Sequence, residues 1–330
     1  MELETTMAQS LRETDDKAGY DAACKRLLSE KIILAWIMKG CVHEFRACDV
    51  NEIAEKYIEG QPQVAEAPVE AGTIIHGTGV EDASAVEGTI TYDIRFFATA
   101  PATGEPIRLI INVEAQNDFY PGYPLIKRAI YYCSRMISAQ YGTEFTASHY
   151  EKIKKVYSIW ICMNPPKTQM NSITSYQIKE DNLVGSVKEP VSNYDLITAV
   201  MINLGSRADG GEDDVLRLLS VLLSSEESAA QKRRILEDDF SIRMTESLDK
   251  EVSLMCNLSK GVEERGIAKG MEQGMKKGME KGMEKGLEKG ILTSLRGLMA
   301  SMGLSVDQAF SALQVPEADW PKYKEMLQIS

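Results

Sequence analysis

The chain has 330 residues, of which 44% are hydrophobic and 26% are charged, and its formal net charge is −12. This length allows a core domain with appendages. The negative charge argues against a generally basic nucleic-acid-binding protein, but not against a locally positive site. The six cysteines form no C-x-x-C pair, so we expect reduced thiols rather than a disulfide scaffold or a zinc module.

The N-terminus is polar and acidic, which is not typical of a signal peptide. No apolar run approaches the roughly 18 residues that a membrane span needs. We therefore expect a cytoplasmic protein whose first residues, 1–18, are disordered.

The first periodic segment, residues 21–45, predicts a long and mostly buried helix. Residues 60–88 contain Pro, Gly and five acids but no Lys or Arg, which indicates a solvated loop or an irregular hairpin. Two strand-like runs follow, at 88–98 and 107–116, on either side of a loop with Pro and Gly.

Residues 123–142 are expected to form an amphipathic helix with Arg128 and Arg135 on its polar side. The predicted apolar stripe of this helix consists of Ile126, Ile130, Cys133 and Ile137. Residues 155–166 are rich in β-branched and aromatic side chains and end at two prolines, which predicts a buried strand. Residues 173–180 predict one more strand at an edge.

Helices are predicted for three further segments, 194–205, 213–225 and 228–244. The order of helix, strand, strand, helix, strand and helical extension predicts a layered α/β domain with a short mixed sheet. We therefore divide this part of the chain into a core at 19–190 and a helical extension at 191–260.

Residues 261–290 carry an internal repeat in which glycine recurs at every fourth position from Gly266 to Gly290, each followed by Ile, Met or Leu. A four-residue period overshoots the helical turn, so both stripes drift about 40° per repeat around a straight helix. Each glycine also costs a helix roughly 1 kcal/mol relative to alanine. Two interpretations are open: self-association of residues 266–290 into a homo-oligomer, or a semi-flexible charged linker.

The last segment, residues 291–330, predicts a small unit of three short helices. Ser305 and Gln308 have the spacing of a capping box, and Pro316 stands near the start of the third helix. The unit has the outline of a helix-turn-helix, but no basic recognition face is visible, so we do not interpret it as a DNA reader.

Two acids, Asp93 and Glu114, stand within the two apolar strand runs. A buried and unpaired acid costs several kcal/mol, so each needs a partner. That partner is either a basic side chain, such as Arg95 or Arg108, or a bound cation. Two strand carboxylates with a carbonyl from Ala115 suit Mg²⁺, which keeps much of its hydration.

The run YDIRF followed by VEAQ looks like the D…E-x-(K/Q) signature of PD-(D/E)XK nucleases. The wider stretches EGTITYDIRFFA, LIINVEAQNDFYPGYPLIKRAIYYCSRMISAQ and KVYSIWICMNPP are similar to the Rpn-like PD-(D/E)XK nuclease family transposases of bacteria. The resemblance covers most of residues 20–290 and is specific in 87–166. It implies a restriction-endonuclease-like α-β-β-β-α-β core, followed by a helical extension and the glycine-repeat tail.

The same resemblance assigns roles to individual residues. Asp93 and Glu114 would be catalytic residues and ligands of Mg²⁺ or Mn²⁺, with the Ala115 carbonyl beside them. Gln116, two residues beyond Glu114 on the same side of the strand, would occupy the place usually held by a lysine. There it can position water but cannot supply positive charge. The resemblance also suggests Glu30 as an additional metal ligand. It further suggests that Lys127, Arg128 and Tyr132 contact DNA phosphate.

The implied activity is metal-dependent hydrolysis of DNA phosphodiester bonds by a recombination-promoting, transposase-like endonuclease. The cation would lower the pKa of a bound water and neutralise charge on the leaving oxygen. The alternative is a catalytically weak or inactive member that acts as a nucleic-acid-binding or self-associating protein, because Gln116 lacks the charge of lysine.

Several of these residues also have ordinary structural interpretations. Arg128 and Tyr132 can be a solvated face and a packing aromatic, Glu30 can be a helix-surface acid, and the loop 117–125 either lines a DNA groove or makes a tight turn. Segment 121–160 carries six Lys or Arg against two acids. This local excess of positive charge is the best candidate for contact with phosphate.

Overall fold

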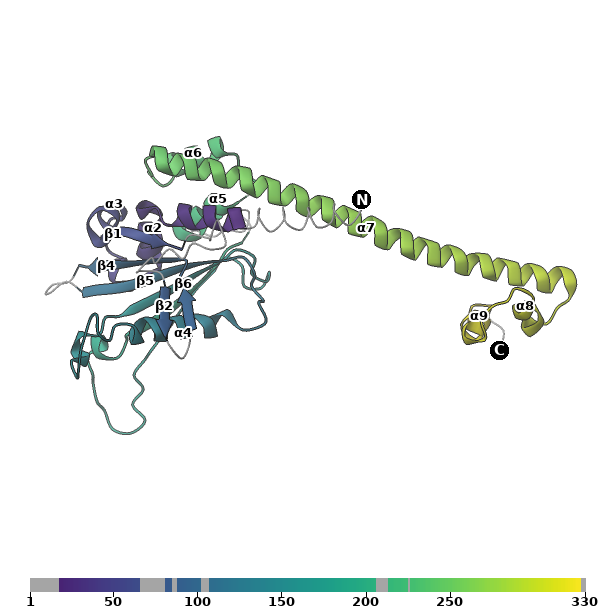
Figure 1. Ribbon diagram of the computed structural model, residues 1–330, viewed down its shortest axis with the longest axis horizontal. Coiled ribbons are helices and arrows are strands. Elements are labelled where there is room, and N and C mark those ends of the chain that lie inside the picture. Colours follow the sequence, from purple (N-terminus) through teal and green to yellow (C-terminus); the bar gives the residue numbers. More distant parts are fainter. Residues whose placement is uncertain are drawn as a thin grey trace. The chain divides into compact units, whose positions relative to one another are not determined.

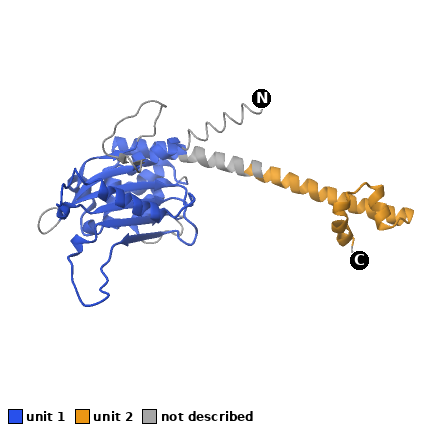
Figure 2. Cartoon of the chain, turned by 60° about the horizontal axis from the view of Figure 1, so that its bottom comes forward, with its two compact units in different colours: residues 1–262 blue, residues 263–330 orange. Residues whose placement is uncertain are grey.

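The computed structural model describes residues 18–65, 81–84, 88–101, 107–205, 213–224 and 226–327. The prediction of disorder for residues 1–18 lies outside the described residues except at Ala18, where a helix begins. In chain order, a helix at 18–28 is followed by α2 (Lys31–Cys41), α3 (Val50–Glu52), β1 (Ile58–Val64), β2 (Glu81–Ser84), β3 (Gly88–Thr91), β4 (Ile94–Ala100), β5 (Ile107–Gln116), α4 (Leu125–Ser138), β6 (Val156–Cys162), β7 (Ser172–Gln177), β8 (Ile197–Asn203), α5 (Asp214–Leu223), α6 (Ala229–Asp238), α7 (Glu246–Met302), α8 (Val306–Ala312) and α9 (Trp320–Met326). The chain divides into two compact units, residues 1–262 and 263–330 (Figure 2).

A six-stranded mixed sheet forms the centre of the first unit, in the order β1-β4-β5-β6-β8-β7 (Figure 1). β1 pairs antiparallel with β4, and β4 pairs antiparallel with β5. β5, β6 and β8 run parallel, and β7 pairs antiparallel with β8 at the far edge. The described part of the unit is therefore a mixed α/β fold, as the order of predicted elements indicates.

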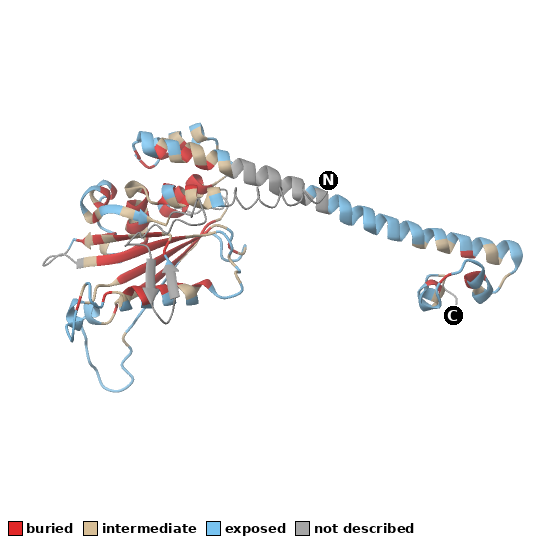
Figure 3. Ribbon diagram, in the orientation of Figure 1, coloured by how far each residue is buried: buried red, intermediate tan, exposed pale blue. Residues whose placement is uncertain are grey.

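Helices cover both faces of this sheet (Figure 1). The helix at 18–28, α2 and α5 pack on one face, where their side chains join those of the strands in one apolar cluster. α4 packs on the other face over a second cluster that includes Tyr92, Tyr132 and Trp160. Because both faces are covered, β6 is buried along its whole length and β8 along nearly all of it (Figure 3).

The crossover helix α4 lies within the predicted range 123–142, but its predicted apolar stripe is wrong in part. Ile130 is exposed, whereas Arg135 is buried and donates to the Tyr131 hydroxyl at 3.3 Å. The buried side consists of Leu125, Ala129, Tyr132, Cys133, Arg135 and Met136. The prediction relied mainly on the isoleucines of this segment. The face that packs on the sheet also includes the small Ala129 and the aromatic Tyr132.

The helix predicted at 194–205 is wrong, because residues 197–203 form strand β8 between β6 and β7. The run ITAVMIN is apolar throughout and contains β-branched residues, which suits a strand covered on both faces. Periodicity alone does not separate such a run from a buried helix. The predicted boundary at residue 190 is therefore also wrong, since β8 completes the sheet and α5 packs into the core of the same unit.

Two differences concern the N-terminal part of the core. The predicted helix at 21–45 is interrupted at Ser29 and Glu30, where Glu30 has an extended backbone and the Ser29 hydroxyl donates to the Arg26 carbonyl. The segment 60–88, predicted as a solvated loop or an irregular hairpin, begins with strand β1, which pairs with β4 across a register shift, and near its end contains β2, which pairs with β3. β1 contains Pro62, which edge strands tolerate, and Gly60 has the positive φ of +59° that the shift requires.

The strand predicted at 88–98 is divided into β3, which pairs with β2 in a separate two-stranded sheet, and β4, whereas the other elements of the first unit confirm the predictions. β4 and β5 form the expected hairpin, β6 the buried strand, β7 the edge strand, and α5 and α6 the two helices after β8. All six cysteines are described and none forms a disulfide. Among the described residues, no helix combines the length and the apolar character that crossing a membrane requires.

The second unit contains the later part of α7 together with α8 and α9. α7 continues as a helix through the glycine repeat and ends at Met302, so the first of the three helices predicted for 291–330 is the end of α7. Ser305 and Gln308 form the predicted capping box. A small core joins the end of α7 to α8 and α9 through Leu295, Phe310 and Tyr323.

The place of β8 in the core gives a prediction about stability. Ile202 is fully buried in β8, so Ile202→Ala is expected to lower the free energy of unfolding by about 2–5 kcal/mol. Ser175→Ala, on the exposed side of the neighbouring strand β7, serves as the control and should change it by less than about 0.5 kcal/mol. Urea denaturation measures both variants; equal, small effects would contradict a core position for β8.

Candidate functional site

The two predicted acids meet where β4 begins and β5 ends. β4 and β5 pair with Ile94 opposite Val113, which brings the preceding residue, Asp93, beside Glu114. The amide of Asp93 donates to Glu114 Oε1 at 3.1 Å, and the amide of Ala115 donates to Asp93 Oδ2 at 3.0 Å. The two carboxylates are thus joined by backbone hydrogen bonds across one strand pair.

A lysine from the N-terminal helix is the cationic partner of Asp93. Lys25 Nζ lies 2.9 Å from Asp93 Oδ1 and 2.6 Å from a carboxylate oxygen of Asp21, one helical turn earlier. Of the two arginines considered as ion-pair partners, Arg108 binds Glu59 and Glu144 instead. The guanidinium of Arg95 lies 5.4 Å from the centre of the Tyr92 ring.

Glu114 is buried, with 3% of its surface exposed, on the face of the sheet that α4 covers. Asn112, two residues earlier on the same face, donates its amide to Glu114 Oε1 at 2.9 Å. Burial and the nearby Asp93 charge raise the pKa of Glu114 to about 8. Burial also raises the pKa of Asp93, although the Lys25 ammonium opposes this shift.

Two of the predicted phosphate-contact residues belong to the same cluster. Arg128 donates to the Tyr132 hydroxyl from Nε at 3.1 Å and from Nη2 at 2.6 Å. Its guanidinium also lies 5.2 Å from the centre of the Trp160 ring. The positive charge of Arg128 opposes the upward shift in the pKa of Glu114, and the charge of Glu114 in turn raises the pKa of Tyr132.

The remaining predicted site residues lie around or away from the pair. Gln116 donates its side-chain amide to the Asp118 carbonyl, and Lys127 is exposed on α4. Glu30 accepts a hydrogen bond of 2.7 Å from the Ser247 hydroxyl and lines a separate cavity with Arg243. The structure therefore does not bring Glu30 to the acid pair.

The basic segment 121–160 offers less free charge than its composition indicates. Lys155 is paired with Asp195 at 2.6 Å and with Glu44 at 3.3 Å, and Arg135 is buried. Lys127 and Lys152 are exposed. Tertiary contacts thus neutralise or bury part of the predicted positive surface.

The donor set around the acid pair is compatible with a hydrated cation. Among the described residues there is no group of three or more His, Cys, Asp or Glu side chains placed to hold a metal, so two carboxylates would have to be completed by water and carbonyl ligands, as Mg²⁺ prefers. The buried Asn112 Oδ1 accepts no hydrogen bond from any described residue. The Lys25 ammonium already binds Asp93 as a monovalent cation.

Sequence reasoning missed Lys25 and Asn112. Asn112 was recognisable, because it alternates with Glu114 and Gln116 along an otherwise apolar strand. Lys25 carries no comparable signal, since its role depends on which turn of the first helix packs beside the start of β4.

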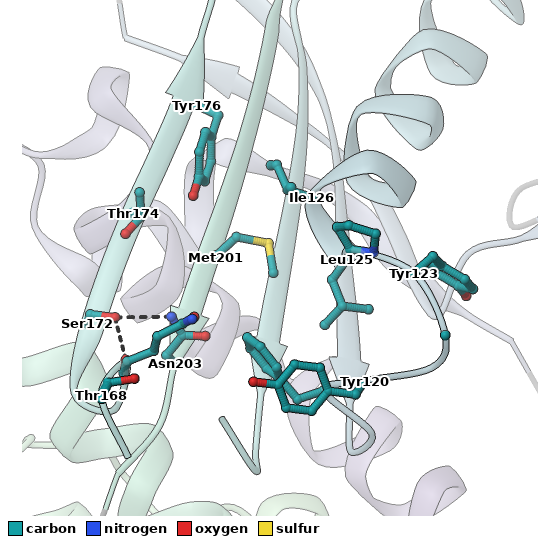
Figure 4. Close-up of a pocket in the computed structure, with 14 residues that line it drawn as sticks. Tyr120, Tyr123, Leu125, Ile126, Thr168, Ser172, Thr174, Tyr176, Met201 and Asn203 are labelled. Atoms are coloured by element: carbon teal, nitrogen blue, oxygen red, sulfur yellow. Dashed lines mark hydrogen bonds between the residues drawn. The ribbon is translucent and has the colours of Figure 1, made fainter. Parts of the chain in front are cut away.

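A cavity of about 750 Å³ lies on the α4 side of the sheet, over β7 and the C-terminal half of β8 (Figure 4). The loop that follows Gln116 and the first turn of α4 form one side, and β7 and β8 form the other. Its principal lining residues are Tyr120, Tyr123, Leu125, Ile126, Ser172, Thr174, Tyr176, Met201 and Asn203. Part of loop 117–125 thus lines a cavity, and its role as the wall of a DNA groove stays a prediction.

Comparisons with models of known protein families, with curated proteins and with solved structures found no match.

The raised pKa of Glu114 predicts how stability depends on pH. Its folded pKa of about 8 lies above the ordinary 4.5, so the folded state retains a proton that the unfolded state loses. This contribution is complete below pH 4.5 and is lost as the pH rises through 8. Metal-free protein should therefore become less stable from pH 5 to pH 8.5, and Glu114→Gln should weaken this dependence.

Urea denaturation at several pH values measures the effect, with Glu237→Gln, an exposed position on α6, as the matched control. A pH dependence that is identical in the native chain and in Glu114→Gln would contradict the assignment of the titrating group.

Proposed function

We propose that this protein is a metal-dependent DNA endonuclease that hydrolyses phosphodiester bonds, of the PD-(D/E)XK type. The observation that carries the proposal is the buried acid pair, in which Asp93 and Glu114 meet across β4 and β5 with the pKa of Glu114 raised. Two carboxylates that repel each other in a buried setting are stabilised by a shared cation.

The order of elements supports the same proposal. The resemblance in the sequence implies a core of the form α-β-β-β-α-β. The helices at 18–28 and α2, then β1, β4, β5, α4 and β6, follow one another in this order within the sheet and its two helical layers. The acids stand at the end of the β4–β5 hairpin, directly before the loop that leads into the crossover helix.

Each residue of the cluster has a separate task in the proposed reaction. Asp93 and Glu114 would hold Mg²⁺ or Mn²⁺ together with the Ala115 carbonyl, and Gln116 would orient the attacking water by hydrogen bonding. A cation bound there lowers the pKa of its water and offsets charge on the leaving oxygen. Arg128 would contact the phosphate that is cleaved, because its guanidinium interacts electrostatically with Glu114 and guanidinium groups bind phosphate well.

Lys25 supplies the positive charge that Gln116 lacks. Its ammonium forms an ion pair with Asp93 and therefore favours the ionised form of that acid, which is the form that binds a metal. Burial by itself lowers the pKa of Lys25, but Asp93 and Asp21 raise it above its usual value. Lys25 is therefore charged throughout the physiological range.

A plasmid-nicking assay tests the proposed activity. The full-length protein should nick supercoiled DNA only when Mg²⁺ or Mn²⁺ is present. Asp93→Ala and Glu114→Ala should each lower the rate by roughly 100-fold or more, because each removes a metal ligand. Glu237→Ala is the control and should cleave at the native rate.

A lysine substitution refines the same assay. Lys25→Met should move the rising limb of the pH–rate profile to higher pH, because Asp93 then ionises without a neighbouring cation, and Lys25→Arg should restore it. Lys31→Met, a lysine bonded to the Ile58 carbonyl, is the matched control. No metal-dependent nicking, or nicking that survives both acid substitutions, would refute the endonuclease.

The alternative function is a catalytically weak or inactive protein that binds nucleic acid or associates with itself. Its support is the low exposure of Glu114 and the neutral Gln116. A distinct observation favours self-association: along α7, Met271, Met275, Met279, Met283 and Leu287 have between 67% and 73% of their surface exposed. A second copy of α7 would cover this stripe, with the intervening glycines allowing the two helices to approach closely.

Light scattering tests this second proposal. The full-length chain should have the mass of an oligomer, and the double substitution Met275→Ser with Met283→Ser should lower it toward that of a monomer. The control is Lys277→Ser with Lys285→Ser, two positions further along and therefore on the opposite side of the helix. A monomeric native chain, or equal effects of the two pairs, would exclude this interface.

A further inference from the structure

The cavity beside the acid pair has the character of a built ligand site. Its walls are mainly aromatic and aliphatic, and they come from two separate parts of the chain. In Figure 4, Thr174 and Tyr176 stand on β7 opposite Leu125 and Ile126 at the start of α4, with Met201 between them. A volume of about 750 Å³ lies within the range of small-molecule and cofactor sites.

One buried polar atom in this wall lacks a partner. Asn203 has 6% of its surface exposed, and its amide nitrogen donates to the Ser172 hydroxyl at 3.1 Å. Its Oδ1 accepts no hydrogen bond from any residue in the described ranges. A buried acceptor left unpaired costs free energy, so a turn of the Asn203 side chain that brings this oxygen to the N–H of a ligand in the cavity would be favourable.

Arg128 connects the cavity to the acid pair. Its Nη1 donates to the Tyr123 hydroxyl at 3.3 Å, on the cavity wall, while Nη2 donates to Tyr132 beside Glu114. The pairing register brings Gln116 opposite Cys162 and Cys162 opposite Asn203. Neighbouring strands are about 4.8 Å apart, so the backbones of Gln116 and Asn203 are separated by roughly 10 Å.

From these contacts we infer that the cavity binds an unstacked nucleobase of a DNA strand whose phosphodiester lies at the acid pair. Tyr120 and Tyr176 provide aromatic faces for stacking, and Asn203 Oδ1 accepts a hydrogen bond from an exocyclic amino group. Inside a duplex the bases are stacked and cannot enter, so the preferred substrate is single-stranded DNA. This inference rests on the proposed nuclease function and names its substrate class.

Binding is measured apart from cleavage. To prevent cleavage, the full-length protein carries Glu114→Gln and the buffer contains a metal chelator. The protein is titrated into a labelled strand of about twelve cytosines, and binding is measured by fluorescence anisotropy. Adding Tyr120→Ala or Tyr176→Ala should weaken binding by about 5- to 150-fold, which is the usual effect of losing one stacking ring. Tyr150→Ala is the control, because Tyr150 is similarly exposed but lies outside the cavity wall.

A second comparison tests the amide. Cytosine carries an amino donor where thymine carries a carbonyl, so oligo-dC should bind roughly 2- to 10-fold tighter than oligo-dT. Asn203→Leu should abolish this preference. Retention of the preference in that variant would overturn the role of Asn203.

The outcomes separate this inference from the proposed activity. Native binding in both tyrosine variants, or equal weakening for a duplex of the same sequence, would overturn the base pocket even if metal-dependent nicking is observed. Tyrosine-dependent binding of single strands without nicking would retain the pocket and refute the nuclease.

Discussion

The antiparallel register of β4 and β5 is the constraint on which the rest of the site depends. It joins the backbone of Asp93 to the carboxylate of Glu114, and the backbone of Ala115 to the carboxylate of Asp93. A slip by one residue would turn Glu114 to the opposite face, away from Asn112, Arg128 and Tyr132. The large apolar clusters on both sides of the sheet oppose such a slip, because every side chain of β5 would change faces with it.

The acid pair carries an electrostatic cost that its surroundings only partly offset. Lys25 forms an ion pair with Asp93, and the positive charge of Arg128, which also donates to the Tyr132 hydroxyl, lowers the pKa of Glu114. Even with these cations, burial raises the pKa of both acids. Ionisable groups whose pKa values are shifted by the fold are typical of functional sites, although structural ion pairs also produce such shifts. The same repulsion that lowers stability is what the proposed cation would relieve.

The helix α4 connects the acid pair with the aromatic cavity, two regions that both take part in the proposed reaction. One of its residues, Arg128, contacts both the acid cluster and the aromatic cavity, while Leu125 and Ile126 at its start line that cavity. The cavity lies over the C-terminal part of β8 and next to the loop that follows β5, and the carboxyl ends of parallel strands are where open α/β sheets commonly bind ligands. A rigid crossover helix packed on the sheet thus sets the spacing between the proposed reaction centre and the proposed base pocket.

The sequence by itself determined the features with a local signal. The alternation around Glu114 marked the strand and its polar side, the buried run at 155–166 marked β6, and Ser305 with Gln308 marked a helix start. It did not separate β8 from a helix, because a strand buried on both faces loses its alternation. Only the tertiary structure decided that Lys25 and not an arginine pairs with Asp93, that Glu30 lies elsewhere, and that Tyr120 and Asn203 share a cavity. Those contacts join residues far apart in the chain, and the packing of helices against the sheet, which no local pattern records, selects them.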